Sequence, residues 1–180
     1  LFTLQSWAHY FLGGVHYQWN ELDAAERHFS AILDNRYTAV AIVVREGLSC
    51  LAEVYQHRGK DAKALRIVDL LGELDREQLG HEDESTRALR ARLLLLRGDL
   101  RGAARWATAY DAPIPDRPLV WRYNPHLIKA QILLAAGEDD DVRSARQILD
   151  ALDEIAERTH NTRAKIELLA TRALTMHLAG

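Results

Sequence analysis

Side chains that could hold a ligand recur at fixed positions along the chain. Counted from Trp7, positions i, i+3, i+7 and i+10 share one helical face, and the same pattern returns at a fixed interval farther along the chain. Aromatic rings supply contact area, and carboxylates, amides and a guanidinium fix orientation. These side-chain types favour non-covalent binding of a small polar ligand or an extended peptide. The predicted binding residues are Trp7, Tyr10, Tyr17, Glu46, Ser49, Glu53, Gln56, Arg92, Asn124 and Gln131.

The alternative interpretation of these positions is a solvated polar face with a few packed rings, because exposed polar residues are the default. The segment 121–124, Trp-Arg-Tyr-Asn, leaves a similar choice open. Tryptophan and arginine are enriched in interaction sites, but Trp121 could instead anchor a loop on the core. Trp106 is interpreted as core or inter-helix packing.

Other reactive side chains give no catalytic or metal-binding pattern, and we expect no enzyme. His9 and His16 share a helical face, but His28 lies in the next helix with no fixed geometry to them, so packed histidines are expected rather than a metal site. The acidic run 138–141 lacks the alternating ligands and glycine of a calcium loop; helix capping and dipole complementation explain it better. Cys50 reads as a buried small apolar residue.

A regular repeat must position these side chains. Gly59, Gly98 and Gly137 are equally spaced, and one further step back lies Asn20, which also tolerates a left-handed helix end. This spacing is called the repeat period below. Small residues follow the same period because helices cross closely where side chains are small. They form two columns: Gly13, Ala52, Ala91, Ala130 and, after a longer step, Ala173, and then Ala25, Ala64, Ala103 and Ala145.

Each repeat reads as two amphipathic helices with apolar residues at steps of three and four. Asp61 can cap one of them, and the prolines of segment 111–118 forbid helix there, so a loop is expected. The fifth unit has only its first helix and would expose Leu168, Leu169 and Met176. The predicted helices are 4–19, 22–34, 38–58, 61–76, 84–97, 100–111, 119–136, 142–159 and 162–179.

The predicted fold is therefore all-α, a right-handed superhelical stack of antiparallel helix pairs, or α-solenoid, with about four and a half hairpins. We expect one repeat domain over residues 1–180, a fragment of a longer protein, with a concave face lined by the first helix of each pair. The expected units are 4–36, 37–80, 81–116, 117–160 and 161–180.

The repeat positions resemble the tetratricopeptide (TPR) family, at a period longer than that family's usual value of about 34 residues. The matching residues are Leu12, Gly13, Ala25 and Phe29 in the first unit, and Leu51, Ala52, Tyr55, Gly59 and Ala64 in the second. Arg90 and Lys129 depart from the pattern, since leucine is typical there. Three segments are also similar to the helical-repeat sensor region of the large ATP-binding LuxR-family regulators, a group that includes the bacterial maltose-operon activator: residues 7–29, 90–107 and 127–137.

This second resemblance implies a sensor module of a transcription activator, which binds an inducer or a regulatory protein in the concave groove and controls oligomerisation. It implies ATP binding only in a separate N-terminal domain of the parent, no cofactor in this segment, contacts with other parent domains and a possible homo-oligomer. A generic protein-interaction scaffold without small-molecule sensing is the alternative, and separating these two requires a binding experiment.

Composition restricts the partners. The net charge is −3, which gives no field for nucleic acid or an acidic membrane. No apolar run is long enough to span a bilayer, so neither direct nucleic-acid contact nor membrane association is expected. Cys50 is the only cysteine, which excludes an internal disulfide, and a cytoplasmic location is expected.

Overall fold

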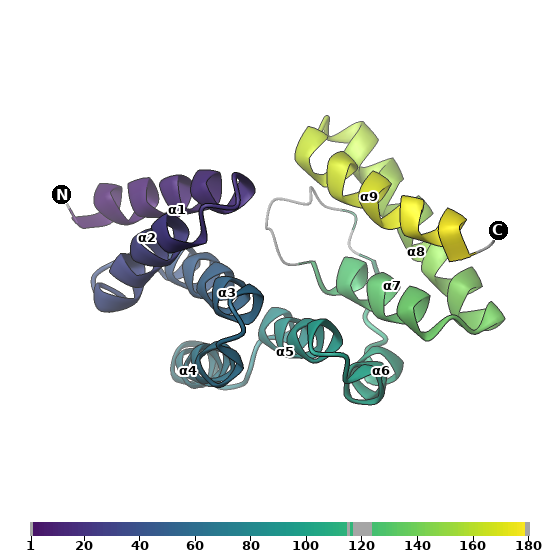
Figure 1. Cartoon of the computed structure of the whole chain (residues 1–180), viewed down its shortest axis with the longest axis horizontal. Coiled ribbons are helices and arrows are strands. Elements are labelled where there is room, and N and C mark those ends of the chain that lie inside the picture. Colours follow the sequence, from purple (N-terminus) through teal and green to yellow (C-terminus); the bar gives the residue numbers. More distant parts are fainter. Residues whose placement is uncertain (1, 115, 117–123, 179–180) are drawn as a thin grey trace. The chain divides into compact units, whose positions relative to one another are not determined.

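The computed structural model of the 180-residue chain describes residues 2–114, 116 and 124–178. These residues form nine helices and no strand, so the all-α prediction is confirmed (Figure 1). The helices are α1 (Phe2–Gln18), α2 (Leu22–Asp34), α3 (Ala41–His57), α4 (Asp61–Leu79), α5 (Glu84–Leu96), α6 (Leu100–Ala109), α7 (Pro125–Ala136), α8 (Asp139–Arg158) and α9 (Thr162–Leu178).

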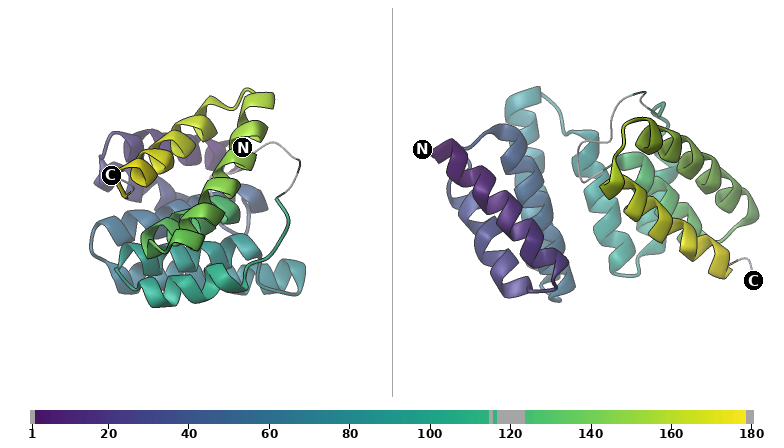
Figure 2. Two further views of the ribbon diagram at one scale, coloured as in Figure 1. Left: turned by 90° about the vertical axis from the view of Figure 1, so that its right-hand side faces the viewer. Right: turned by 90° about the horizontal axis from the view of Figure 1, so that it is seen from above.

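The chain divides into two compact units, Leu1–Thr86 and Arg87–Gly180. In the first, α1 packs on α2, α2 on α3, and α3 on α4. In the second, α6 packs on α7, α7 on α8, and α8 on α9, and two turned views keep α1 beside α2 and α7 beside α8 (Figure 2). Below, α1, α3, α5, α7 and α9 are called first helices, and α2, α4, α6 and α8 second helices. Within each unit these helices thus pack in chain order, as in a helical-repeat stack. The expected division into a single domain with five units stays a prediction.

The glycine column marks helix ends, as predicted. Gly59, Gly98 and Gly137 have φ of 69°, 80° and 75°, and Asn20 has φ of 60°. These left-handed values strain side chains other than glycine and asparagine. The fifth member of the column, Gly180, lies outside the described residues.

The small-residue columns are buried at helix crossings. A Cβ on Gly13 would lie 2.7 Å from the ring of Phe29, so α1 approaches α2 more closely than a residue with a side chain at position 13 would allow. Ala173 differs from the prediction, because it lies on an exposed face of α9. Leu168 was also expected to be exposed, but it packs with the α7 and α8 core, whereas Leu169 is exposed as predicted. The side chain of Met176 lies outside the described ones.

Three predicted helix starts differ from the structure by three or more residues, and one predicted cap is wrong. The helix expected from 38 begins at Ala41, because Val40 before it has an extended backbone, with φ of −65° and ψ of 130°. The helix expected from 119 begins at Pro125, because Asn124 caps it and proline suits the first helical position. The one expected from 142 begins at Asp139, because Asp139, Asp140 and Asp141 complement the helix dipole in its first turn. Lys60 occupies the N-cap position of α4, so Asp61 is its first residue and not its cap.

Candidate functional site

Two tyrosines of α1 donate hydrogen bonds to two carboxylates of α3. The Tyr10 hydroxyl lies 3.2 Å from Oε2 of Glu46, and the Tyr17 hydroxyl lies 3.4 Å from Oε2 of Glu53. Both carboxylates are buried, although both were expected on an open face. The pairs lie two turns apart on the same two helices, since the two tyrosines and the two glutamates are each seven positions apart. Four predicted binding residues therefore meet across neighbouring first helices.

The second unit repeats the arrangement with other chemistry. Arg92 of α5 donates from Nη1 to Oε1 of Gln131 on α7 at 2.6 Å, and the two residues are one repeat period, 39 residues, apart. The amide of Gln131 then donates from Nε2 to Oγ1 of Thr171 on α9, at 3.3 Å. Thr171 was not among the predicted residues. It lies 40 residues after Gln131, whereas the longer last step of the small-residue column, from Ala130 to Ala173, would place the equivalent of Gln131 at Leu174.

We call these side chains the polar ladder: Tyr10, Tyr17, Glu46 and Glu53 in the first unit, and Arg92, Gln131 and Thr171 in the second. Each hydrogen-bonded pair of the polar ladder is called a rung below, and each rung joins consecutive first helices within one unit. The ladder offers hydroxyl, carboxylate, amide and guanidinium groups. These groups bind and orient polar ligands.

Three other predicted residues make local contacts. Trp7 stacks on the ring of Phe11 at 5.7 Å and meets Tyr10 edge-on at 6.2 Å. Ser49 donates to the carbonyl of Arg45 one turn earlier. Gln56 donates to Asp61 at 3.0 Å, which joins α3 to the start of α4. Their part in binding stays a prediction.

Asn124 has a clear structural role. Its side-chain oxygen accepts hydrogen bonds from the backbone amides of His126 and Leu127, at 2.8 and 3.3 Å. It therefore accepts hydrogen bonds from backbone amides in the first turn of α7 that have no partner within the helix, as an N-cap residue does. Residues 121–123, which precede it, lie outside the described residues.

A family model described as the MalT-like TPR region matches residues 2–180. The chain belongs to that family. The resemblance to the helical-repeat region of the maltose-operon activator group is thereby confirmed. No curated protein and no solved structure matches the chain. A MalT-like TPR region is a helical regulatory or scaffold module rather than a catalytic one.

This TPR region brings three histidines together, which the sequence analysis did not expect. Nδ1 of His9 lies 3.0 Å from Nδ1 of His28, and the ring of His16 stacks on that of His28 at 5.3 Å. Burial lowers the pKa of His28, and the nearby His9, His16 and Arg27 lower it further. Within the described part of the chain, no group of His, Cys, Asp or Glu has the geometry to hold a metal ion. The ring contacts of His28 with His9 and His16 join α2 to α1.

A buried ion network that the sequence did not reveal holds the end of the first unit. Asp75 of α4 is buried, and Arg45 of α3 lies 3.3 Å from it and 2.9 Å from Asp83. The other oxygen of Asp75 accepts from the Asp83 amide and the Thr86 hydroxyl. Burial raises the pKa of Asp83, but hydrogen bonds from Ser85 and the guanidinium of Arg45 outweigh this and leave it lowered. The network fixes the segment that leads into α5.

The second unit contains a corresponding buried cluster. The Tyr110 hydroxyl lies 3.3 Å from the ring of His126, whose Nε2 lies 3.0 Å from the carbonyl oxygen of Ala112. Lys129 donates to the Tyr110 carbonyl at 2.5 Å. Burial lowers the pKa of His126, and the charge of Lys129 acts in the same direction. Trp106 stacks on Tyr110 and packs against the core, as predicted.

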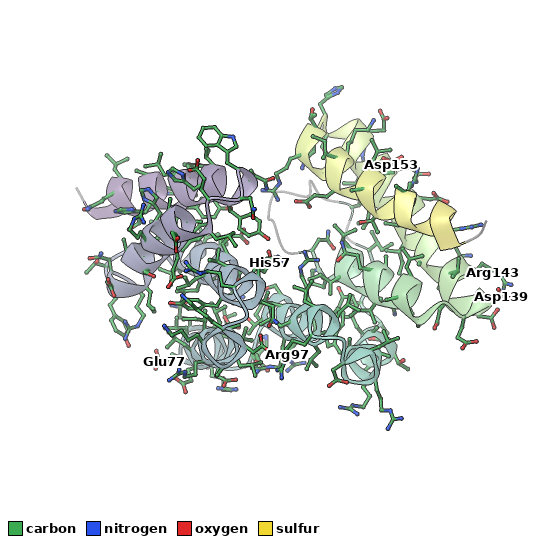
Figure 3. All side chains as sticks on the ribbon, in the orientation of Figure 1. His57, Glu77, Arg97, Asp139, Arg143 and Asp153 are labelled. Carbon is green, nitrogen blue, oxygen red and sulfur yellow. The ribbon has the colours of Figure 1, made fainter. Side chains whose placement is uncertain are left out.

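Cys50 is buried, as predicted. Asp139 and Arg143 lie at the N-terminal end of α8 (Figure 3), where Arg143 bonds to Asp140 at 2.8 Å. The acidic run thus starts a helix, as its dipole interpretation predicted, but the capping prediction is wrong, because the N-cap residue Glu138 makes no side-chain cap hydrogen bond. Among the described helices, none is both long and apolar enough to cross a membrane.

Two cavities lie apart from the polar ladder. One of about 530 Å³ lies beside α2 and the α3–α4 turn, and its charged lining includes Glu26 and Arg58, which form an ion pair at 2.8 Å. The other, of about 440 Å³, lies between α6, α7 and α8 and is lined in part by Lys129, Leu133 and Ile148. Neither is lined by a predicted binding residue.

Proposed function

We propose that this TPR region is the signal-input module of a LuxR-type, ATP-binding transcription activator. An inducer or a regulatory protein binds to the polar ladder, and binding controls the oligomerisation and activity of the parent. Family membership supports the class of parent protein. The observation that carries the site is the pair of buried carboxylates, Glu46 and Glu53, each held by a tyrosine of the neighbouring first helix.

The expected mechanism is a population shift. Each rung joins two consecutive first helices, so a ligand that hydrogen-bonds to a rung competes with the contact between two hairpins. A ligand shifts the equilibrium only if it binds one hairpin packing more tightly than another. The packing favoured by the ligand is the one compatible with an oligomerised activator.

The remaining parts of the activator have separate roles in this proposal. ATP binds in an N-terminal domain of the parent, and promoter DNA is bound elsewhere, because the net charge of −3 gives this region no affinity for a polyanion. The region works in the cytoplasm, where Cys50 remains reduced, and it contacts other domains or copies of the parent.

A generic protein-interaction scaffold is the second candidate. Two observations favour it: the ladder groups bond to one another, and both described cavities lie elsewhere. Within each unit, such a surface suits an extended peptide laid across two consecutive first helices. A scaffold predicts a peptide or domain partner and no effect of small molecules.

Two readouts separate these candidates. Calorimetry and thermal shift of the chain against metabolites and regulatory proteins identify a ligand, and a pull-down from extract with and without its metabolites tests their effect on capture. Glu53→Gln and Arg92→Ala are expected to lower both binding and activation by the parent. Glu73→Gln and Arg101→Ala, exposed changes on second helices, are the matched controls. Unchanged activation in both ladder variants, with no ligand or partner bound, would remove the ladder as the site.

A further inference from the structure

The first helix, α1, carries a stripe of apolar side chains that faces solvent. Leu4 is 77% exposed, Phe11 60% and Val15 43%, and Ala8 between them is exposed too. Their spacing of four, three and four positions places them on one face of the helix. Leu4, Ala8, Phe11 and Val15 are called the α1 stripe below. Exposed apolar surface of this continuity marks an interaction site.

The same positions of α3 are buried. The residues one repeat period after those of the α1 stripe are Val43, Gly47, Cys50 and Val54. All four are buried, and the exposed fractions of Val43, Cys50 and Val54 are 1%, 4% and 0%. The second helix of the preceding hairpin covers them. A Cβ on Gly47 would lie only 2.6 Å from Cδ1 of Ile32 on α2.

The second unit shows the same relationship independently. Three repeat periods after Phe11 and Val15 lie Ile128 and Ile132 of α7, and both are buried. They belong to one apolar cluster with Ala103 and Ala107 of α6, the second helix of the preceding hairpin. In both units, then, a second helix covers the face of the first helix that follows it.

From this register we infer that the α1 stripe is the docking site of an amphipathic α-helix. This helix packs on α1 in the way that α2 packs on α3. Its aliphatic side chains lie over Leu4, Phe11 and Val15, and one of them is placed over Ala8 as Ile32 is over Gly47. Docking there adds a layer to the hairpin stack and continues the interface that α2 forms with α3.

The chemistry of the occupant differs from that of α2 in one respect. Arg58, at the end of α3, forms ion pairs with Asp23 and Glu26 of α2. The position one repeat period earlier is Trp19, and it is 67% exposed. A helix on the α1 stripe therefore meets an indole at this end, and it needs apolar residues where α2 has carboxylates.

The repeat register allows a test in one polypeptide. A copy of residues 21–39 is joined directly ahead of Leu1, which gives it the spacing to α1 that α2 has to α3. In the copy alone, Asp23→Ala and Glu26→Ala remove the carboxylates, and Phe29→Gln replaces a ring that nothing would cover. The matched control carries the same extension with Ile32→Asp in the copy.

Amide hydrogen exchange of α1 and thermal unfolding are measured for the original chain and both extended chains. We expect the extension to slow exchange in α1 by about tenfold and to raise Tm by about 3 °C or more. The Ile32→Asp control should do neither. Exchange as fast in the extended chain as in the original, or equal protection by both extensions, would overturn the inference.

Sedimentation of the original chain tests the other occupant, a second copy. Association that rises with concentration and disappears in Phe11→Ser would assign the α1 stripe to self-association and overturn the proposal. A monomer at all concentrations, with Phe11→Ser folded as the original chain is, supports the helix as occupant. The Phe11 side chain is already exposed, so this variant is expected to fold.

Discussion

The Tyr17 hydroxyl donates a hydrogen bond to the Glu53 carboxylate, which is only 1% exposed and lies one first helix away. Tyr10 and Glu46 repeat the contact two turns earlier. A buried carboxylate depends on such donors, because burial removes its water. The contact between hairpins and the chemistry of the candidate site are therefore the same interaction. His57, at the end of α3 (Figure 3), has its ring 6.0 Å from that of Tyr17.

Removing one hydroxyl should destabilise the chain. Tyr17→Phe deletes the donor to Glu53, and a hydrogen bond within a protein contributes about 0.5–1.5 kcal/mol to stability. We expect a loss of that size in the free energy of unfolding, measured by urea denaturation. Tyr37→Phe, at an exposed tyrosine, should change it by less than about 0.5 kcal/mol. Equal effects of the two changes would show that the rung contributes no stability.

Two adjacent glycines of α1 should respond oppositely to alanine. Gly13→Ala places a Cβ 2.7 Å from the Phe29 ring, and overpacking of this kind costs about 1–3 kcal/mol. Gly14 has nothing within 4 Å of its Cβ position, so Gly14→Ala should stabilise the helix by about 0.5–1 kcal/mol. Chemical denaturation of both variants measures the difference. Stabilisation by Gly13→Ala would contradict the close crossing of α1 and α2.

These glycines also show what the sequence could predict. A small residue at each repeat period identified the helix crossings, and left-handed residues at the same interval identified the helix ends. The period then placed Tyr10, Tyr17, Glu46 and Glu53 on first helices, where the structure brings them together. Such positions are predictable because they depend on local backbone geometry and on a repeated distance.

Asp75 should be among the polar residues most sensitive to substitution in the first unit. Asp75→Ala leaves the guanidinium of Arg45 without its buried partner and two donors without their acceptor. Breaking a buried ion pair on one side costs about 3–5 kcal/mol. The exposed change Glu73→Ala, on the same helix, is the control for thermal and urea unfolding. A variant of Asp75 as stable as that control would rule out the network as an anchor of segment 83–86.

Stability should fall in mild acid because of His28. Burial, then His9, His16 and Arg27, hold the pKa of His28 below its ordinary 6.5 in the folded chain. The unfolded chain therefore takes up the proton first. The stabilisation is complete above about pH 6.5 and is lost as the pH falls below it. Unfolding free energies between pH 5 and 8 should depend less on pH in His28→Gln than in the exposed variant His81→Gln. Identical pH profiles of the two variants would exclude His28 as a source of the pH dependence of stability.

The histidines and Asp75 also mark what the sequence could not predict. His9, His16 and His28 come together only because α1 crosses α2 at a particular angle, which side-chain types do not specify. The sequence pattern predicts that a single aspartate on a charged helix is exposed. Asp75 is buried because α3 and segment 83–86 pack against it. Glu46 and Glu53 were misplaced on an open face for the same reason.

The central claim, that the polar ladder receives the regulatory signal, is tested most directly by inducer-dependent transcription in the parent activator. Glu53→Gln and Arg92→Ala are compared with Glu73→Gln and Arg101→Ala at equal protein levels. The account predicts that both ladder variants lose at least about tenfold in response, equivalent to about 1.4 kcal/mol of coupling, while both controls respond normally. Normal induction in both ladder variants, or an equal loss in the controls, would contradict it.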